Sequence, residues 1–263
     1  MRGDTFRRVL VAVPLAILAV ALVAAGGWVL AAGLAVVGVI CLHEFYELVE
    51  TRRPVKVAGF LSMIAIVLAA ELGGVSAVLF CGWATLPLVF VLTVSRPRVD
   101  DSSDSIFATA FGVWWIAIAL GLALLLREMP HGAGVLLIAL VATFASDIGS
   151  YFGGRSLGTR PLAPRISPRK TVEGLLSGIA ASIVVAALST LYAGWLGFGE
   201  AVLIGITVSL LAPCGDLFES LLKRDAGAKD TANTLGPHGG LLDRLDGVLF
   251  SVVGVYWLWT LLS

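Results

Sequence analysis

Long hydrophobic runs, separated by short polar stretches, recur along almost the whole chain. A helix needs about 20 mostly apolar residues to cross the hydrocarbon core of a membrane. Runs near this length cover 9–25, 28–48, 57–72, 74–94, 106–126, 133–152, 173–193, 201–221 and 242–262, with the first break at Gly26-Gly27. The pattern predicts an all-α integral membrane protein, a polytopic bundle of about nine transmembrane helices, because lipid cannot satisfy unpaired backbone groups.

The basic residues predict how these helices are oriented. Seventeen of the eighteen Lys and Arg residues fall on one side of the membrane if the spans alternate from a cytoplasmic N-terminus, and only Arg127 falls on the other. Short loops that remain in the cytoplasm carry an excess of Lys and Arg. We therefore expect the N-terminus and the longest polar loops to face the cytoplasm.

Composition excludes several classes of protein. Hydrophobic residues make up 58% of the chain and charged residues 14%, whereas an ordinary soluble domain is about 25% charged. The low charge argues against a cytosolic enzyme, a disordered chain and a free nucleic-acid binder. Cys41, Cys81 and Cys214 lie in apolar stretches without C-x-x-C spacing, so neither a disulfide framework nor a zinc site is indicated.

The polar residues divide the chain into two regions. Residues 1–132 are mostly Ala, Val, Leu and Gly, and we expect them to form a helical scaffold with lipid or dimer contacts. Residues 133–263 contain two polar loops, 153–172 and 221–242, rich in Gly, Pro, Lys, Arg and Asp. We expect the chemistry in this second region.

The first group of polar residues begins inside a hydrophobic run. A carboxylate such as that of Asp147 costs about 2.5–3.5 kcal/mol within a span unless it is paired or solvated. It is therefore interpreted either as a functional group or as the partner of a basic residue on a neighbouring helix.

The same group continues at the start of the next predicted span. Thr171 is placed to cap that helix, with Glu173 in its first turn complementing the helix dipole. The alternative is that Ser167, Arg169, Lys170 and the free amides of the helix start bind an anion.

The second group of polar residues lies between the last two spans. Asp216 stands at the end of one span, and Asp243 and Asp246 share a face at the start of the next. Three carboxylates from two helix ends suit Mg²⁺, with water and substrate phosphates completing its shell. The alternative is a pair of interfacial ion pairs, Glu219–Lys223 and Asp243–Arg244. His238 either caps a turn or acts with Gly239-Gly240, whose backbone amides can approach a phosphate closely.

The run from Ser220 to Asp246 resembles the signature of the phosphatidate cytidylyltransferases, the CDP-diacylglycerol synthases. The resemblance rests on Ser220, Lys223, Arg224, Lys229, Asp230, His238, Gly239, Gly240, Asp243, Arg244 and Asp246. Ser167-Pro168, Lys170-Thr171 and Glu173-Gly174 are similar to the other polar stretch of that family. The resemblance covers about the last 120 residues.

The resemblance implies Mg²⁺-dependent transfer of CMP from CTP to phosphatidate at the cytoplasmic face of the cell (inner) membrane, with pyrophosphate released. It implies metal binding by Asp216, Asp243 and Asp246, and leaves open a second metal ion. It implies catalytic roles for Lys223, Arg224, Lys229, Asp230, His238 and Arg244. Substrate binding would fall to Asp147, Ser167, Arg169, Lys170, Thr171, Glu173, Ser220, Gly239 and Gly240. The implied partners are CTP, phosphatidate, membrane lipid and a second copy in a homodimer, with no nucleic acid.

Two other interpretations remain at this point. A related CTP-dependent membrane enzyme, similar to a CDP-archaeol synthase or a polyprenol kinase, would use similar metal and phosphate chemistry. An ion-coupled transporter would use the same carboxylates as an ion path, but such sites lie near the membrane midplane between repeats, and no internal repeat is evident in the sequence.

Overall fold

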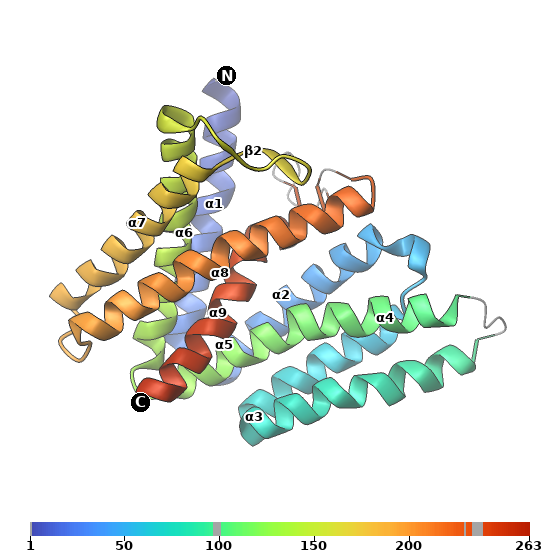
Figure 1. Cartoon of the computed structure of the whole chain (residues 1–263). Coiled ribbons are helices and arrows are strands. Elements are labelled where there is room, and N and C mark those ends of the chain that lie inside the picture. The colour runs from blue at the N-terminus through green and yellow to red at the C-terminus, as the bar shows by residue number, and fades with distance from the viewer. Residues whose placement is uncertain (1, 97–100, 229, 233–238) are drawn as a thin grey trace. The chain divides into compact units, whose positions relative to one another are not determined.

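The computed structural model describes residues 2–96, 101–228, 230–232 and 239–263, with side chains from Pro14 onward. These residues form helices and one short two-stranded sheet (Figure 1). They divide into two compact units. The first contains Met1–Glu128 and Asp230–Leu242, and the second contains Met129–Lys229 and Asp243–Ser263.

The first unit begins with three helices whose ends follow the predicted runs. They are α1 (Arg2–Ala25), α2 (Gly27–Leu48) and α3 (Lys56–Val94). The predicted break at Gly26-Gly27 is confirmed, since both glycines have positive φ angles, 65° and 47°. A second break interrupts α3 at Gly74, where φ is 75° and ψ is −167° and the chain reverses direction (Figure 1). Glycine adopts such a conformation without steric cost, so α3 contains the two predicted runs 57–72 and 74–94.

The core of the first unit is one nearly continuous helix. It consists of α4 (Ser102–Gly112), the π-helical turn η2 (Val113–Ala117) and α5 (Ile118–Glu128), most of which is buried. Phe45 packs against Phe111 and Trp115, and the hydroxyl of Tyr46 donates to the Thr109 carbonyl at 3.0 Å. The short 3₁₀ helix η1 (Glu50–Arg52) connects α2 to α3.

The second unit contains four long helices and the sheet. In chain order these are α6 (Gly132–Leu157), β1 (Pro161–Ala163), β2 (Ser167–Thr171), α7 (Val172–Leu188), the 3₁₀ helix η3 (Ser189–Leu191), α8 (Phe198–Asp225) and α9 (Leu242–Leu262). Small residues let these helices approach closely, as is common between membrane helices. A side chain at Gly178 of α7 would overlap Ser150 and Ser146 of α6, and one at Gly215 of α8 would overlap the Asp246 backbone of α9.

The sheet lies in the stretch that was predicted only as a polar loop. β1 and β2 pair in antiparallel fashion, with Pro161 opposite Thr171 and Ala163 opposite Ser167. β2 runs directly into α7, so Lys170 and Thr171 are held at the start of that helix.

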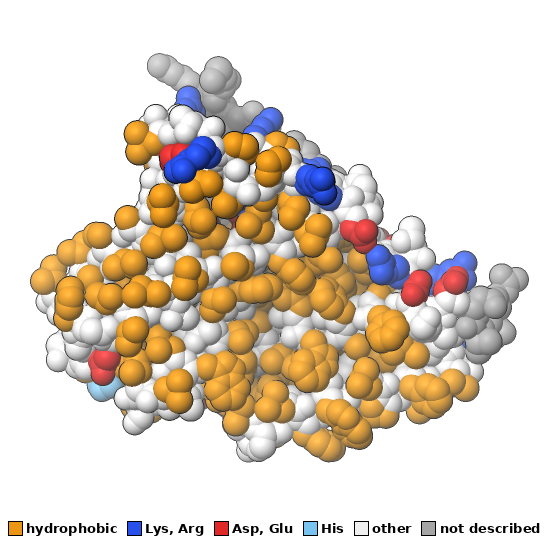
Figure 2. All heavy atoms as spheres, viewed as in Figure 1, with side chains coloured by type: hydrophobic (Ala, Val, Ile, Leu, Met, Phe, Trp, Pro, Cys, Tyr) orange, Lys and Arg blue, Asp and Glu red, His pale blue; other side chains and the backbone are white. Residues whose placement is uncertain are grey.

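The described residues include seven helices that are long and apolar enough to cross a membrane. Many large hydrophobic side chains are exposed on the protein surface, and they dominate the face shown in Figure 2. A surface of this kind is suited to lipid. An all-α polytopic membrane protein is therefore confirmed, while the count of about nine crossings stays a prediction.

Candidate active site

A lysine of α8 connects the cytoplasmic ends predicted for the last two spans. Lys223 Nζ donates to Glu219 Oε2 at 2.9 Å and to Asp243 Oδ1 of α9 at 2.6 Å. The side chain of Glu219 is 1% exposed, that of Asp243 9% and that of Lys223 13%. Charges enclosed to this degree are stable only when they are paired. The ion pair predicted between Glu219 and Lys223 is present, and Asp243 extends it to a second helix.

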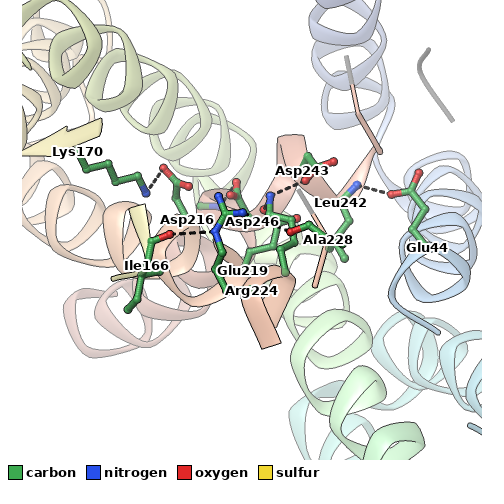
Figure 3. Close-up of polar contacts among 12 residues, drawn as sticks. Glu44, Ile166, Lys170, Asp216, Glu219, Arg224, Ala228, Leu242, Asp243 and Asp246 are labelled. Carbon is green, nitrogen blue, oxygen red and sulfur yellow. Dashed lines mark hydrogen bonds and ion pairs between the residues drawn. The ribbon is translucent and has the colours of Figure 1, made fainter. Parts of the chain in front are cut away.

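A second lysine joins the sheet to α8. Lys170 Nζ of β2 lies 2.5 Å from Asp216 Oδ2 (Figure 3). Asp147 of α6 is exposed and has Asp216, Lys170 and Arg244 as its charged neighbours. The two groups of polar residues that the sequence separates by about 50 positions therefore meet at one place.

Two further carboxyl groups of the site lie against each other. Asp246 of α9 accepts a hydrogen bond from its neighbour, the Gly247 amide, at 2.7 Å, and its side chain lies beside that of Glu219 (Figure 3). Within the described part of the chain, no donor reaches Glu219 Oε1, although this oxygen is buried. Such a pair of carboxyl groups requires a cation or a proton between them.

Together these residues form what we call the charge cluster. It contains five carboxyl groups and three cationic groups, and its members are Asp147, Asp216, Glu219, Asp243, Asp246, Lys170, Lys223 and Arg244. Counted formally, the cluster has two more negative than positive charges.

The three predicted metal-binding aspartates are not arranged as a metal site. In the ranges described, no group of three or more Asp, Glu, His or Cys side chains could hold a metal ion. Two of the three aspartates are instead paired with lysines, Asp216 with Lys170 and Asp243 with Lys223. Metal binding by Asp216, Asp243 and Asp246 stays a prediction.

The start of α7 matches the capping interpretation. Thr171 Oγ1 accepts a hydrogen bond from the Gly174 amide at 3.1 Å, which confirms Thr171 as the helix cap. Glu173 accepts from the amides of Thr159 and Arg160 at 3.0 and 3.1 Å and from Arg160 Nε at 2.8 Å. The carboxyl group of Glu173 thus closes the turn that leads into β1.

The remaining predicted residues lie around the charge cluster or beyond the described residues. Arg224 is exposed, and its Nε donates to the Ile166 carbonyl at 3.3 Å, which connects the end of α8 to the turn between β1 and β2 (Figure 3). Ser167 and Ser220 are half-buried, and Arg169 and Asp230 are exposed. Lys229 and His238 are outside the described residues.

Gly239 and Gly240 belong to the first unit, and both are buried. A side chain at Gly240 would overlap the carboxyl group of Glu44 and the hydroxyl of Thr231. Glu44 also accepts hydrogen bonds from the amides of Leu241 and Leu242. The Glu44 carboxyl group therefore lies close to Gly240 in the structure, and phosphate binding by the glycine pair stays a prediction. Glu44 was not among the predicted site residues, although an acid within a hydrophobic run was a usable signal.

The fold and the charge cluster define a polytopic membrane protein with acidic and basic side chains gathered at the ends of neighbouring helices. Residues 6–262 match the model of the cytidylyltransferase family. The chain belongs to this family, which confirms the resemblance seen in the sequence.

Several curated relatives support this assignment. The phosphatidate cytidylyltransferase of Synechocystis sp. is 30% identical over 273 residues, which cover 93% of each chain. That of Mycobacterium leprae is 39% identical over 64% of this chain and 54% of its own. That of Helicobacter pylori is 42% identical over 48% of this chain and 47% of its own. The match to the Synechocystis protein therefore extends over nearly the whole chain, whereas the other two cover 64% and 48% of it.

Proposed function

We infer that the chain transfers CMP from CTP to phosphatidate, giving CDP-diacylglycerol and pyrophosphate. The observation that carries this inference, beside the family assignment, is the position of Lys223. Its ammonium group joins Glu219, the residue just before the signature run, to Asp243 near the end of that run. The signature residues on α8 and α9 thus act together at one place.

The reaction depends more on stabilising the negative charges of its two substrates than on proton transfer. A phosphate oxygen of phosphatidate attacks the α-phosphorus of CTP, and the bond from that phosphorus to the bridging oxygen of pyrophosphate breaks. The attacking oxygen is already anionic near neutral pH, so no strong general base is required. The main barrier is repulsion between the anionic lipid and the triphosphate, and phosphoryl transfer is in general achieved by positioning and electrostatics.

Cationic side chains of the site supply part of this stabilisation. Lys170 and Lys223 can exchange their carboxylate partners for phosphate oxygens when CTP binds. Arg169, Arg224 and Arg244 of the same unit are exposed, and a guanidinium group can bind phosphate through two hydrogen bonds. The same side chains would stabilise the charge that develops on pyrophosphate as it leaves.

The chemistry of the charge cluster fits Mg²⁺. All of its acidic donors are oxygens, the atoms that Mg²⁺ prefers, and Glu219 Oε1 is buried without a hydrogen bond from the described residues. We propose that Asp216, Asp243 and Asp246 hold the ion once the lysines turn to the nucleotide. When bound, Mg²⁺ would neutralise triphosphate charge and act as a Lewis acid at the reacting phosphate.

The site is proposed to face the cytoplasm, where CTP is available. The support is the distribution of basic residues, of which all but Arg127 fall on one side in the predicted topology. In this orientation the acyl chains of phosphatidate stay in the membrane while its phosphate meets CTP at the surface. A homodimer remains part of the proposal.

A labelling experiment tests this function. Purified protein is incubated with phosphatidate, Mg²⁺ and CTP labelled at either the α- or the γ-phosphate, and the lipid product is identified. We expect label from the α-phosphate alone, in a lipid that comigrates with CDP-diacylglycerol. Label from the γ-phosphate would indicate a kinase instead. Labelling of an ether lipid or a prenyl acceptor in preference to phosphatidate would indicate a different acceptor.

A further inference from the structure

One acidic side chain of the first unit binds the backbone of the signature run. Glu44, near the end of α2, is 1% exposed. Its Oε1 accepts from the Leu241 amide at 2.9 Å, and its Oε2 accepts from the Leu242 amide at 2.8 Å (Figure 3). Leu242 is the first residue of α9. The two oxygens of one carboxyl group thus accept hydrogen bonds from two consecutive backbone amides.

This arrangement solves a problem that every helix start poses. The first amides of a helix have no partner within the helix and are usually satisfied by a side chain close by in sequence. Here the acceptor is 197 and 198 positions away from the two amides. A buried amide without a partner is costly, so the contact holds Leu241 and Leu242 in one place relative to α2.

The neighbouring glycine fits this interpretation. A Cβ atom at Gly240 would overlap Glu44 Oε2 and Thr231 Oγ1. The absence of a side chain at this signature position therefore lets the backbone come close enough for the Glu44 carboxyl group to reach both amides.

We propose that Glu44 is a positioning residue for CMP transfer, an inference that rests on the function proposed above. Leu242 is followed directly by Asp243, whose carboxyl group pairs with Lys223. By fixing the two residues before Asp243, Glu44 sets the place from which the signature run enters α9. The two residues before Asp243 are therefore held by Glu44, which lies outside residues 133–263, the region in which the sequence predicted the chemistry.

Glu44→Gln tests the proposal, with Glu47→Gln as its matched control. Gln offers one acceptor where two are needed, and its NH₂ group would face an amide. Glu47 lies on the same helix but is exposed and pairs with Lys56. We expect kcat to fall about 10- to 100-fold in Glu44→Gln, with faster amide hydrogen exchange in a peptide covering 239–245. The control should match the wild type in both measurements.

The two readouts separate the outcomes. Unchanged exchange at 239–245 in Glu44→Gln would overturn the proposed anchor, whether or not the wild type makes CDP-diacylglycerol. Faster exchange with an unchanged kcat would make Glu44 structural only and would also overturn the proposal. If Glu44→Gln does not fold, Gly240→Ala tests the same contact, because its Cβ would overlap Glu44 Oε2. The same fall in kcat and the same faster exchange at 239–245 are expected. A wild type without CMP transfer but with normal protection at 239–245 would reject the proposed function instead.

Discussion

The two units use their charged side chains in different ways. In the first unit the ion pairs described lie at exposed ends of helices, as between Arg53 and Asp101 at 3.8 Å or Lys56 and Glu50 at 2.8 Å. In the second unit Lys223 is enclosed with Glu219 and Asp243. Exposed pairs contribute little to stability, whereas an enclosed pair is kept only where its charges are matched. The difference indicates that an enclosed network of ion pairs, here Glu219, Lys223 and Asp243, marks the region of chemistry.

Three polar side chains enclosed in the first unit have backbone partners instead. The Tyr46 hydroxyl bonds the Thr109 carbonyl, the Thr109 hydroxyl accepts from the Val55 amide at 2.7 Å, and Glu44 bonds two amides of the signature run. These contacts hold connections and helix starts in place. We interpret these contacts as a scaffold within the first unit that includes Leu241 and Leu242, the two residues before Asp243.

The largest expected effect is the loss of turnover in Asp243→Asn. Asn keeps the size of the side chain but removes its negative charge. That charge pairs with Lys223, and we propose that it also binds Mg²⁺. We expect kcat to fall at least about 100-fold, measured as labelled lipid formed by protein purified from the membrane. Asp104→Asn, at an exposed position in the first turn of α4, is the control and should keep full activity. Near-normal turnover in Asp243→Asn would remove this residue from the site.

A second prediction compares Lys223→Ala with Lys56→Ala. Loss of Lys223 leaves enclosed carboxylates unpaired, which should lower the free energy of unfolding by about 3–5 kcal/mol. Loss of Lys56, which is 29% exposed and pairs with the exposed Glu47 and Glu50, should cost at most about 1 kcal/mol. Lys223→Ala should also raise the KM for CTP or phosphatidate, since the ammonium group is proposed to bind phosphate. Denaturant titration in detergent measures the effect on stability, and steady-state kinetics measure the effect on KM. Equal results for the two variants would contradict the proposed difference between Lys223 and Lys56.

A smaller effect is expected from removing the cap of α7. Thr171→Val deletes the acceptor of the Gly174 amide, which should cost about 1 kcal/mol and lower the melting temperature by about 2–4 °C. Thr190→Val is the control, because the Thr190 hydroxyl donates to the Ala187 carbonyl at the other end of the helix and caps no helix start. A melting temperature for Thr171→Val equal to that of the control would argue against the cap.

The sequence predicted the helices well because hydrophobic length is a local property. The ends of α2, the break at Gly74 and the cap at Thr171 all lie within a few residues of their predicted places. The short sheet was missed, since Pro161, Pro164 and Pro168 interrupt any alternation of apolar and polar residues. Its strands are held by pairing with each other, which no local pattern reveals.

The partners of the site residues were less predictable than their positions. Lys170 and Asp216 were assigned to phosphate and metal separately, and their ion pair depends on how β2 meets α8. Glu44 could have been flagged by the argument used for Asp147, since a carboxyl group within a span is costly unless it is paired. Its partners, nearly 200 positions away, could not have been named without the structure.

The most direct test of the account is the dependence of CMP transfer on Mg²⁺. Purified protein is treated with a chelator in excess over divalent cations, and transfer of α-phosphate label from CTP to phosphatidate is measured before and after Mg²⁺ is restored. The proposed role of the carboxylates on α8 and α9 predicts that transfer stops with the chelator and returns with Mg²⁺. Transfer that persists in excess chelator would contradict it.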